Sequence, residues 1–161
     1  MKKGAFGILG IVFMAWFGAP AMAADTLVLG AVVPLSGGTA HYGFNAKRGL
    51  EMAFEDINAK GGIRVKGKDY LLKLEACDDE GKSDKAATCG RKLASMYKVP
   101  IIYTPASWSG FPLMGFNEKM NFIIMCTSQS ASFTTQGNKL VIRWTINPAV
   151  TMGPWVKLLI K

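Results

Sequence analysis

The clearest hydrophobic pattern in the chain lies between residues 42 and 63. Four apolar residues of this stretch follow the spacing i, i+3, i+4 and i+7: Leu50, Ala53, Phe54 and Ile57. This spacing places them on one face of a helix, while charged residues occupy the opposite face. The pair Gly61-Gly62 comes next, and glycine ends helices readily because it adopts the left-handed conformation without a Cβ penalty. We therefore predict an amphipathic helix that ends at this pair.

Short apolar runs predict the strands of a sheet. The run 27–33 is almost entirely apolar, which is typical of a strand buried on both faces of a parallel sheet. Further strands are predicted at 70–77, 99–103, 122–125 and 140–145. Helices are predicted from an N-cap at Ser83 to Tyr97, at about 112–120 after a loop at 104–110, and from residue 151 with Pro154 in the first turn. This alternation predicts an α/β fold with a doubly wound parallel sheet and right-handed crossovers.

The N-terminus has the three parts of a secretory signal peptide. Lys2 and Lys3 are followed by the apolar run 5–17 and by Ala21-Met22-Ala23, an A-x-A cleavage site. The apolar run is shorter than the ~20 residues that span a bilayer, so a cleaved signal at 1–23 is favoured over a membrane anchor. We expect residues 24–161 to form one exported domain, with a Gram-negative periplasm as the simplest compartment.

Charge and motifs exclude several functions. The formal net charge is +8, but part of it belongs to the signal and the remaining basic residues alternate with acids, so we expect no nucleic-acid partner. Residues 62–69 resemble a P-loop, yet Asp69 replaces the required hydroxyl and the segment follows a helix, so a turn is predicted.

No sequence motif indicates an enzyme. His41 is the only histidine and no G-x-S-x-G elbow accompanies it, so it is interpreted as a loop residue and no catalytic residue is assigned. The triplet Asp78-Asp79-Glu80 lacks the ligand spacing of a calcium loop and is interpreted as a solvated turn. The sequence assigns no metal site and no cofactor.

Three loops with small or hydroxyl-bearing residues each follow a predicted strand: 36–38, 106–109 and 127–130. In a doubly wound sheet such loops emerge at one edge, where ligands bind. Hydroxyls and the backbone N–H groups of helix N-termini suit a carboxylate. The aromatic residues Tyr42 and Trp108 suit the wall of a pocket for an apolar or planar group.

With these segments identified, the chain resembles the periplasmic solute-binding proteins of the Leu/Ile/Val type, which serve ABC importers. The resemblance rests on 30–43, 49–63 and 74–87, and more weakly on 142–154. It implies a type I periplasmic-binding-protein fold, in which two α/β lobes close on a ligand. The chain would be the N-terminal lobe, truncated at the crossover to a missing second lobe, and the lack of a helix stop before Lys161 also predicts truncation.

The resemblance also implies roles for individual residues. Tyr42 would touch the ligand, Ser107 would bind its carboxylate, and Ser128 or Gln129 would bind the carboxylate and amino group. Trp108 stands where the family has small residues. Its bulky indole would reduce the space for a ligand beside Ser107 or favour a flat ligand.

The implied ligand is an amino acid, an amide or an aromatic acid, and the implied partners are ABC permease subunits, with the complete protein a monomer. A sensor module with the same fold and a hydrolase on a doubly wound sheet are the alternatives.

The family also bears on the three cysteines. In the family, the cysteine at Cys77 commonly pairs with one in the loop after the third strand, but that loop has Ala106 here. The family's strand order would place Cys77 and Cys126 three strand spacings apart, roughly 14 Å, beyond the ~7 Å limit for a disulfide. A Cys77–Cys89 bridge stays open, while three reduced thiols are the favoured state.

Overall fold

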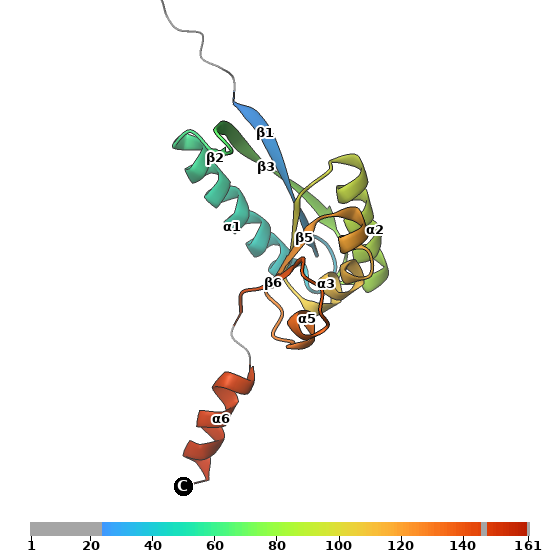
Figure 1. The fold of residues 1–161 in the computed structure, drawn as a ribbon. Coiled ribbons are helices and arrows are strands. Elements are labelled where there is room, and N and C mark those ends of the chain that lie inside the picture. The colour runs from blue at the N-terminus through green and yellow to red at the C-terminus, as the bar shows by residue number, and fades with distance from the viewer. Residues whose placement is uncertain (1–23, 146–147, 161) are drawn as a thin grey trace, which may run out of the picture.

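A computed structural model gives the fold of residues 24–145 and 148–160 (Figure 1). The predicted signal peptide, residues 1–23, lies outside these described residues. Within them, no helix is both long and apolar enough to cross a bilayer.

Six strands of the described chain form one sheet in the order β2-β3-β1-β4-β5-β6. The strands are β1 Asp25–Val33, β2 Ile63–Val65, β3 Lys68–Asp78, β4 Ile101–Thr104, β5 Ile123–Cys126 and β6 Val141–Arg143. All neighbouring strands run parallel except β2 and β3, which form an antiparallel hairpin. The predicted parallel sheet is confirmed, and so is the strand order that separates Cys77 from Cys126. The short strand β2 was missed, because residues 62–69 were interpreted as a turn alone.

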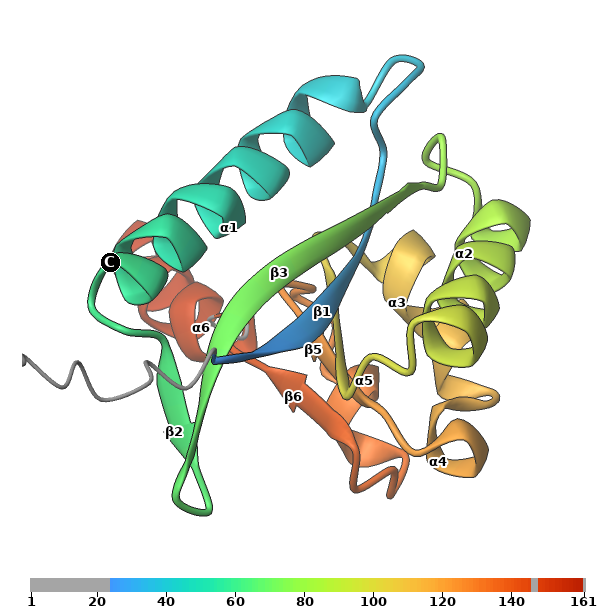
Figure 2. The same ribbon diagram turned by 90° about the horizontal axis from the view of Figure 1, so that it is seen from above.

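Helices cover both faces of the sheet (Figure 2). The helices are α1 Ala40–Ala59, α2 Ser83–Met96, α3 Ser107–Met114, α4 Asn117–Met120, α5 Ser132–Thr135 and α6 Pro148–Leu159. Helix α1 packs on β3 and β1, while α2, α3 and α5 lie against the opposite face. This two-sided arrangement is the predicted doubly wound α/β fold.

Helix α1 ends as its sequence predicts. Gly61 and Gly62 both have positive φ, and Gly62 donates its N–H to the Ile57 carbonyl at 3.0 Å. The Asn58 side chain then joins the helix to the sheet, since it donates to the Leu72 carbonyl at 2.8 Å and accepts from the Leu72 N–H at 2.7 Å. Of the four apolar residues predicted on the buried face, Ala53 is exposed.

The main core lies between the sheet and helices α2, α3 and α5. Its fully buried members include Val32 of β1, Ile102 of β4, Ile124 of β5, Leu113 of α3 and Phe133 of α5. Each predicted strand therefore contributes to one continuous apolar layer, which fixes the positions of the loops that follow the strands.

Several predicted boundaries were wrong. Helix α3 begins at Ser107, inside the predicted loop, and contains Pro112, so 107–109 form a first helical turn. His41 lies in the first turn of α1 and not in a loop. Helix α6 begins at Pro148, so Pro154 is inside it and not in its first turn. Ser83 is the first helical residue of α2, whose N-cap is Lys82.

Cys77 and Cys89 form a disulfide, with Cα atoms 5.6 Å apart, whereas Cys126 keeps a buried free thiol. The expectation that all three thiols are reduced was therefore wrong. The bridge joins the end of β3 to the middle of α2. It fixes this end of β3 at the residue before Asp78.

Replacing both Cys77 and Cys89 by Ala should lower the free energy of unfolding by about 3 kcal/mol, because the closed loop, with a sequence separation of 12, no longer restricts the unfolded chain. Urea unfolding of the two proteins measures the difference. Under denaturing, non-reducing conditions, mass labelling of the wild type should modify Cys126 alone. Three labelled thiols would contradict the bridge.

Candidate functional site

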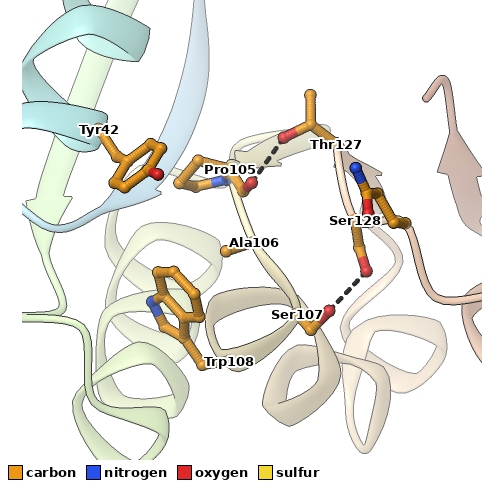
Figure 3. Close-up of a pocket in the computed structure, with 8 residues that line it drawn as sticks. Tyr42, Pro105, Ala106, Ser107, Trp108, Thr127 and Ser128 are labelled. Atoms are coloured by element: carbon orange, nitrogen blue, oxygen red, sulfur yellow. Dashed lines mark hydrogen bonds between the residues drawn. The ribbon is translucent and has the colours of Figure 1, made fainter. Parts of the chain in front are cut away.

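An open pocket of about 420 Å³ lies at the carboxyl edge of the sheet (Figure 3). Its lining residues are Tyr42, Pro105, Ala106, Ser107, Trp108, Thr127, Ser128 and Gln129. All five residues singled out from the sequence are in this set. The loop 36–38, which was expected at the same edge, is exposed and does not line the pocket. Pro105, Ala106 and Thr127 were not singled out as site residues, although Ala106 and Thr127 belong to the predicted loops 106–109 and 127–130 and Pro105 directly precedes the first of them.

Ser107 lies at the start of α3, where backbone N–H groups have no acceptor within the helix. The N-cap residue is Ala106, whose methyl side chain carries no oxygen to accept from these groups. The N-terminus of α3 therefore faces the pocket with its donors available and its partial positive charge uncompensated by a capping side chain. Such an end suits an anionic group.

Two hydroxyls meet on one side of the pocket. The Oγ atoms of Ser107 and Ser128 are 2.6 Å apart (Figure 3). Ser128 Oγ also accepts from the Ser130 N–H at 3.1 Å. Either hydroxyl can be the donor, and in both cases the pair holds the β4–α3 and β5–α5 loops together. Thr127 reinforces the contact by donating to the Pro105 carbonyl at 2.7 Å.

Cys126 lies beneath these two loops. Its thiol is fully buried, accepts from the Ser128 N–H at 3.3 Å, and lies 3.8 Å from the Ala106 carbonyl oxygen, which it approaches as a donor. Burial raises the pKa of the thiol, and this outweighs the hydrogen bond from the Ser128 N–H, which acts in the other direction. The sulfur is thus a neutral part of the support beneath the pocket and not a nucleophile.

Tyr42 reaches the pocket because Gly43 allows a close approach. A Cβ atom on the buried Gly43 would lie 1.7 Å from the Pro34 carbonyl oxygen. Only glycine lets the first turn of α1 pack this tightly on the end of β1. Tyr42 is 58% exposed, and its ring lies against that of His41, with ring centroids 4.2 Å apart.

The N-terminal turn of α3 is anchored from below by a buried carboxylate. Asp79 is fully buried, as is Ser109, whose hydroxyl donates to Asp79 Oδ2. Asp79 Oδ1 accepts the Gly81 N–H at 2.8 Å. The interpretation of 78–80 as a solvated turn was therefore wrong. Asp79 directly follows strand β3, at the carboxyl edge of the sheet, and this position was the one signal in the sequence for its burial.

Asp78 holds the neighbouring loop. Its Oδ1 accepts the Leu35 N–H at 2.7 Å and the Glu80 N–H at 2.9 Å. Burial raises the pKa of this carboxyl, but hydrogen bonds from the Ser36 hydroxyl and from backbone N–H groups outweigh it, so the pKa lies below its ordinary value. The loop 36–38 thus contributes to the support of the site and not to its lining.

The described chain offers no obvious metal centre. In this part of the chain, no three His, Cys, Asp or Glu side chains lie together as candidate metal ligands. What the pocket presents is a set of hydroxyl and backbone donors beside two aromatic rings. Chemically, this arrangement can hold a small anion with an apolar or planar portion.

The chain is similar to known proteins of one family. Residues 26–161 match the model of a family described as periplasmic binding protein. A Pseudomonas aeruginosa protein named leucine-, isoleucine-, valine-, threonine-, and alanine-binding protein is 28% identical over 158 residues, which cover 96% of this chain and 41% of that protein. The chain therefore spans about two fifths of the length of this relative.

Solved structures share the fold. A branched-chain amino acid transporter substrate binding protein from Streptococcus pneumoniae, in complex with isoleucine, superposes with a TM-score of 0.69 at 23% identity, covering 78% of this chain and 35% of that one. An ABC transporter substrate-binding protein from Desulfitobacterium hafniense, in complex with Leu, gives a TM-score of 0.69 at 20% identity, covering 84% and 38%.

Ser109→Ala should lower the free energy of unfolding by about 2 kcal/mol, because it leaves a buried carboxylate oxygen of Asp79 without its donor. Urea unfolding at neutral pH measures this loss. Ser107→Ala, two residues earlier in the same helical turn, is the matched control and should lower the free energy of unfolding by less than about 1 kcal/mol. Equal effects of the two changes would mean that the Asp79–Ser109 contact does not anchor α3.

Stability should fall as the pH drops below about 4, the ordinary pKa of an aspartate, in part through Asp78. A carboxyl whose pKa is lowered in the folded state stabilises it above the unfolded pKa, and this contribution is lost as the pH falls through the folded pKa. Asp78→Asn should reduce the loss of unfolding free energy between neutral and acid pH. Ser36→Ala, which removes one donor, should reduce that loss less. An unchanged acid profile for Asp78→Asn would contradict this role.

Proposed function

Because the chain belongs to the periplasmic binding protein family, we propose that it captures a small solute for an ABC importer. The predicted signal peptide at 1–23 supports export, so the protein would act in the periplasm and hand its ligand to permease subunits. Residues 24–161 would form the N-terminal lobe of the binding unit. A sensor with the same fold is the alternative, and no feature of the described residues favours it.

The observation that carries the proposal is the Ser107–Ser128 hydroxyl pair beside the uncapped N-terminus of α3, with Oγ atoms 2.6 Å apart. A ligand carboxylate placed here would accept from Ser107 and from backbone N–H groups of the helix. Hydrogen bonds to an ionised acceptor are stronger than those between neutral groups. The carboxylate would therefore make the strongest contacts with the pocket and would orient the ligand.

We propose an amino acid or a related small carboxylate or amide as the ligand. The names of the Pseudomonas relative and the complexes with isoleucine and Leu point to amino acids in those proteins. In this chain, Ser128 and Gln129 would contact the carboxylate and amino group, while Tyr42 and Trp108 would contact the side chain. The two hydroxyls and the two rings line the same pocket, as this division of roles requires.

Binding would involve no bond cleavage. His41, the only histidine, lies against the Tyr42 ring, and Ser107 shares its hydroxyl with Ser128. A hydrolase would need a base next to its serine, whereas the neighbour here is a second hydroxyl. We therefore propose a binding role without catalysis.

Ser107→Ala should weaken L-leucine binding by about tenfold, because it removes one hydrogen bond to a charged group. Chemical-shift titration of the purified chain measures this weak interaction. Leucinamide, which lacks the carboxylate, should bind the wild type at least about tenfold more weakly than leucine.

The matched control for this titration is Ser95→Ala. The Ser95 hydroxyl contacts only the Lys92 carbonyl of its own helix, so the change should leave affinity unaltered. The proposal would be wrong if leucine and a set of other small carboxylates and amides left the spectrum unchanged. It would also be wrong if Ser107→Ala bound leucine as tightly as the wild type does.

A further inference from the structure

One face of the sheet is covered only in part. In β4 and β5, the side chains that point toward α2, α3 and α5 are fully buried, whereas those on the other face are only partly buried. Helix α1 lies on this second face, where it packs on β3 and β1 (Figure 2). No helix in the described part of the chain packs extensively on the same face of β4, β5 and β6. Strands of a parallel sheet are normally buried on both faces.

This part of the sheet face is apolar. The strand register pairs Tyr103 with Met125 and Met125 with Ile142, so the three side chains form one row across the sheet. Ile142 is 49% exposed, and Trp144, which lies two positions later and so on the same face, is 59% exposed. Apolar side chains gathered on a surface mark a site of interaction with another molecule. We call this surface the open face, and it consists of Ile101, Tyr103, Ile123, Met125, Ile142 and Trp144.

Helix α6 is a second apolar surface. Lys157 is its only charged residue, and the helix extends away from the sheet without an extended contact to another described element (Figure 1). Helices that are apolar on several sides are normally buried, so α6 needs a covering surface. Six of its apolar side chains are 49–79% exposed: Val150, Met152, Trp155, Val156, Leu158 and Leu159.

The chain after β6 is held in a way that keeps α6 off the open face of its own copy. The Trp144 N–H donates to the Cys126 carbonyl at 3.4 Å. The Thr145 hydroxyl lies 3.1 Å from the Thr127 carbonyl oxygen and 3.3 Å from that of Ser128. These bonds tie the chain to the loop at the carboxyl edge of the sheet. The chain therefore continues beyond this edge, where α6 lies, and does not turn back over the strands (Figure 1).

We infer that two copies of this chain pair about a two-fold axis, with α6 of each copy packed on the open face of the other. Each copy then provides both surfaces and covers both, as the self-complementary contact of a two-fold dimer requires. The dimensions agree, because three strands about 4.8 Å apart match the width of one helix, which is about 10 Å.

The available area is also sufficient. At roughly 100 Å² of exposed surface for each side chain, the six residues of α6 together with Ile142 and Trp144 offer about 800 Å², which is what one partner contributes to a standard interface. The inference does not depend on the proposed function, because no residue of α6 or of the open face lines the pocket. The monomer implied by the family resemblance refers to a complete protein with two lobes, whereas this pairing concerns the chain of 161 residues.

Sedimentation equilibrium of the purified chain measures its mass in solution, which should be twice that of one chain. Leu159→Glu in α6 and Ile142→Glu on the open face should each raise the dissociation constant of the dimer at least about tenfold, because each would bury a carboxylate without a partner. Met96→Glu is the matched control, because Met96 is 67% exposed on α2 and belongs to neither surface. A monomeric wild type, or assemblies larger than a dimer, would overturn the inference.

A mixture of the two variants tests the exchange of helices. A pair made of one Leu159→Glu chain and one Ile142→Glu chain keeps one intact contact, between the unchanged α6 of the second and the unchanged open face of the first. The mixture should therefore associate at least about threefold more tightly than either variant alone. No gain on mixing would overturn the inference. So would an Ile142→Glu protein that stays dimeric while Leu159→Glu does not, because α6 would then pair with itself. If Ile142→Glu fails to fold, Trp144→Glu on the same face replaces it.

Discussion

The buried carboxylate of Asp79 is the interaction on which the site depends. A carboxylate without exposure to water must find hydrogen-bond donors inside the protein, and here they come from Ser109 in α3 and from the Gly81 backbone. The loop after β3 and the N-terminal turn of α3 are therefore bound to one another. The disulfide at Cys77 and the hydrogen bonds to Asp78 fix the same loop from its other side. These contacts fix the helical turn that carries Ser107 and Trp108.

Much of the fold follows from the sequence pattern. The apolar run of β1 predicts a central parallel strand, and Gly61-Gly62 predicts the end of α1, because both signals depend on local chemistry. Helix α3 was placed too late, since Ser, Trp and Gly are weak helix formers and their helical turn is stabilised by Asp79, which is distant in the sequence. Strand β2 was missed for a related reason: a three-residue strand owes its existence to pairing with β3.

The site residues were accessible to sequence reasoning because each one follows a strand of a parallel sheet. Tyr42, Ser107 and Ser128 come from three separate segments, and the topology alone brings them to one edge. The support beneath them was not accessible. Asp79 looks like a turn residue, and only the packed structure shows that it is buried. The Cys77–Cys89 bridge likewise depended on how the end of β3 lies against α2.

The contact of Gly43 with Pro34 restricts how binding preference can diverge among proteins built like this one. Even a methyl group at position 43 would overlap the Pro34 carbonyl. A substitution at this position therefore cannot change the width of the pocket by moving helix α1, which carries Tyr42. Under the proposed function, ligand preference would instead change through side chains that project from this fixed backbone, above all at positions 42 and 108. Single substitutions at such positions would then alter which ligand is preferred, while the backbone geometry stays the same.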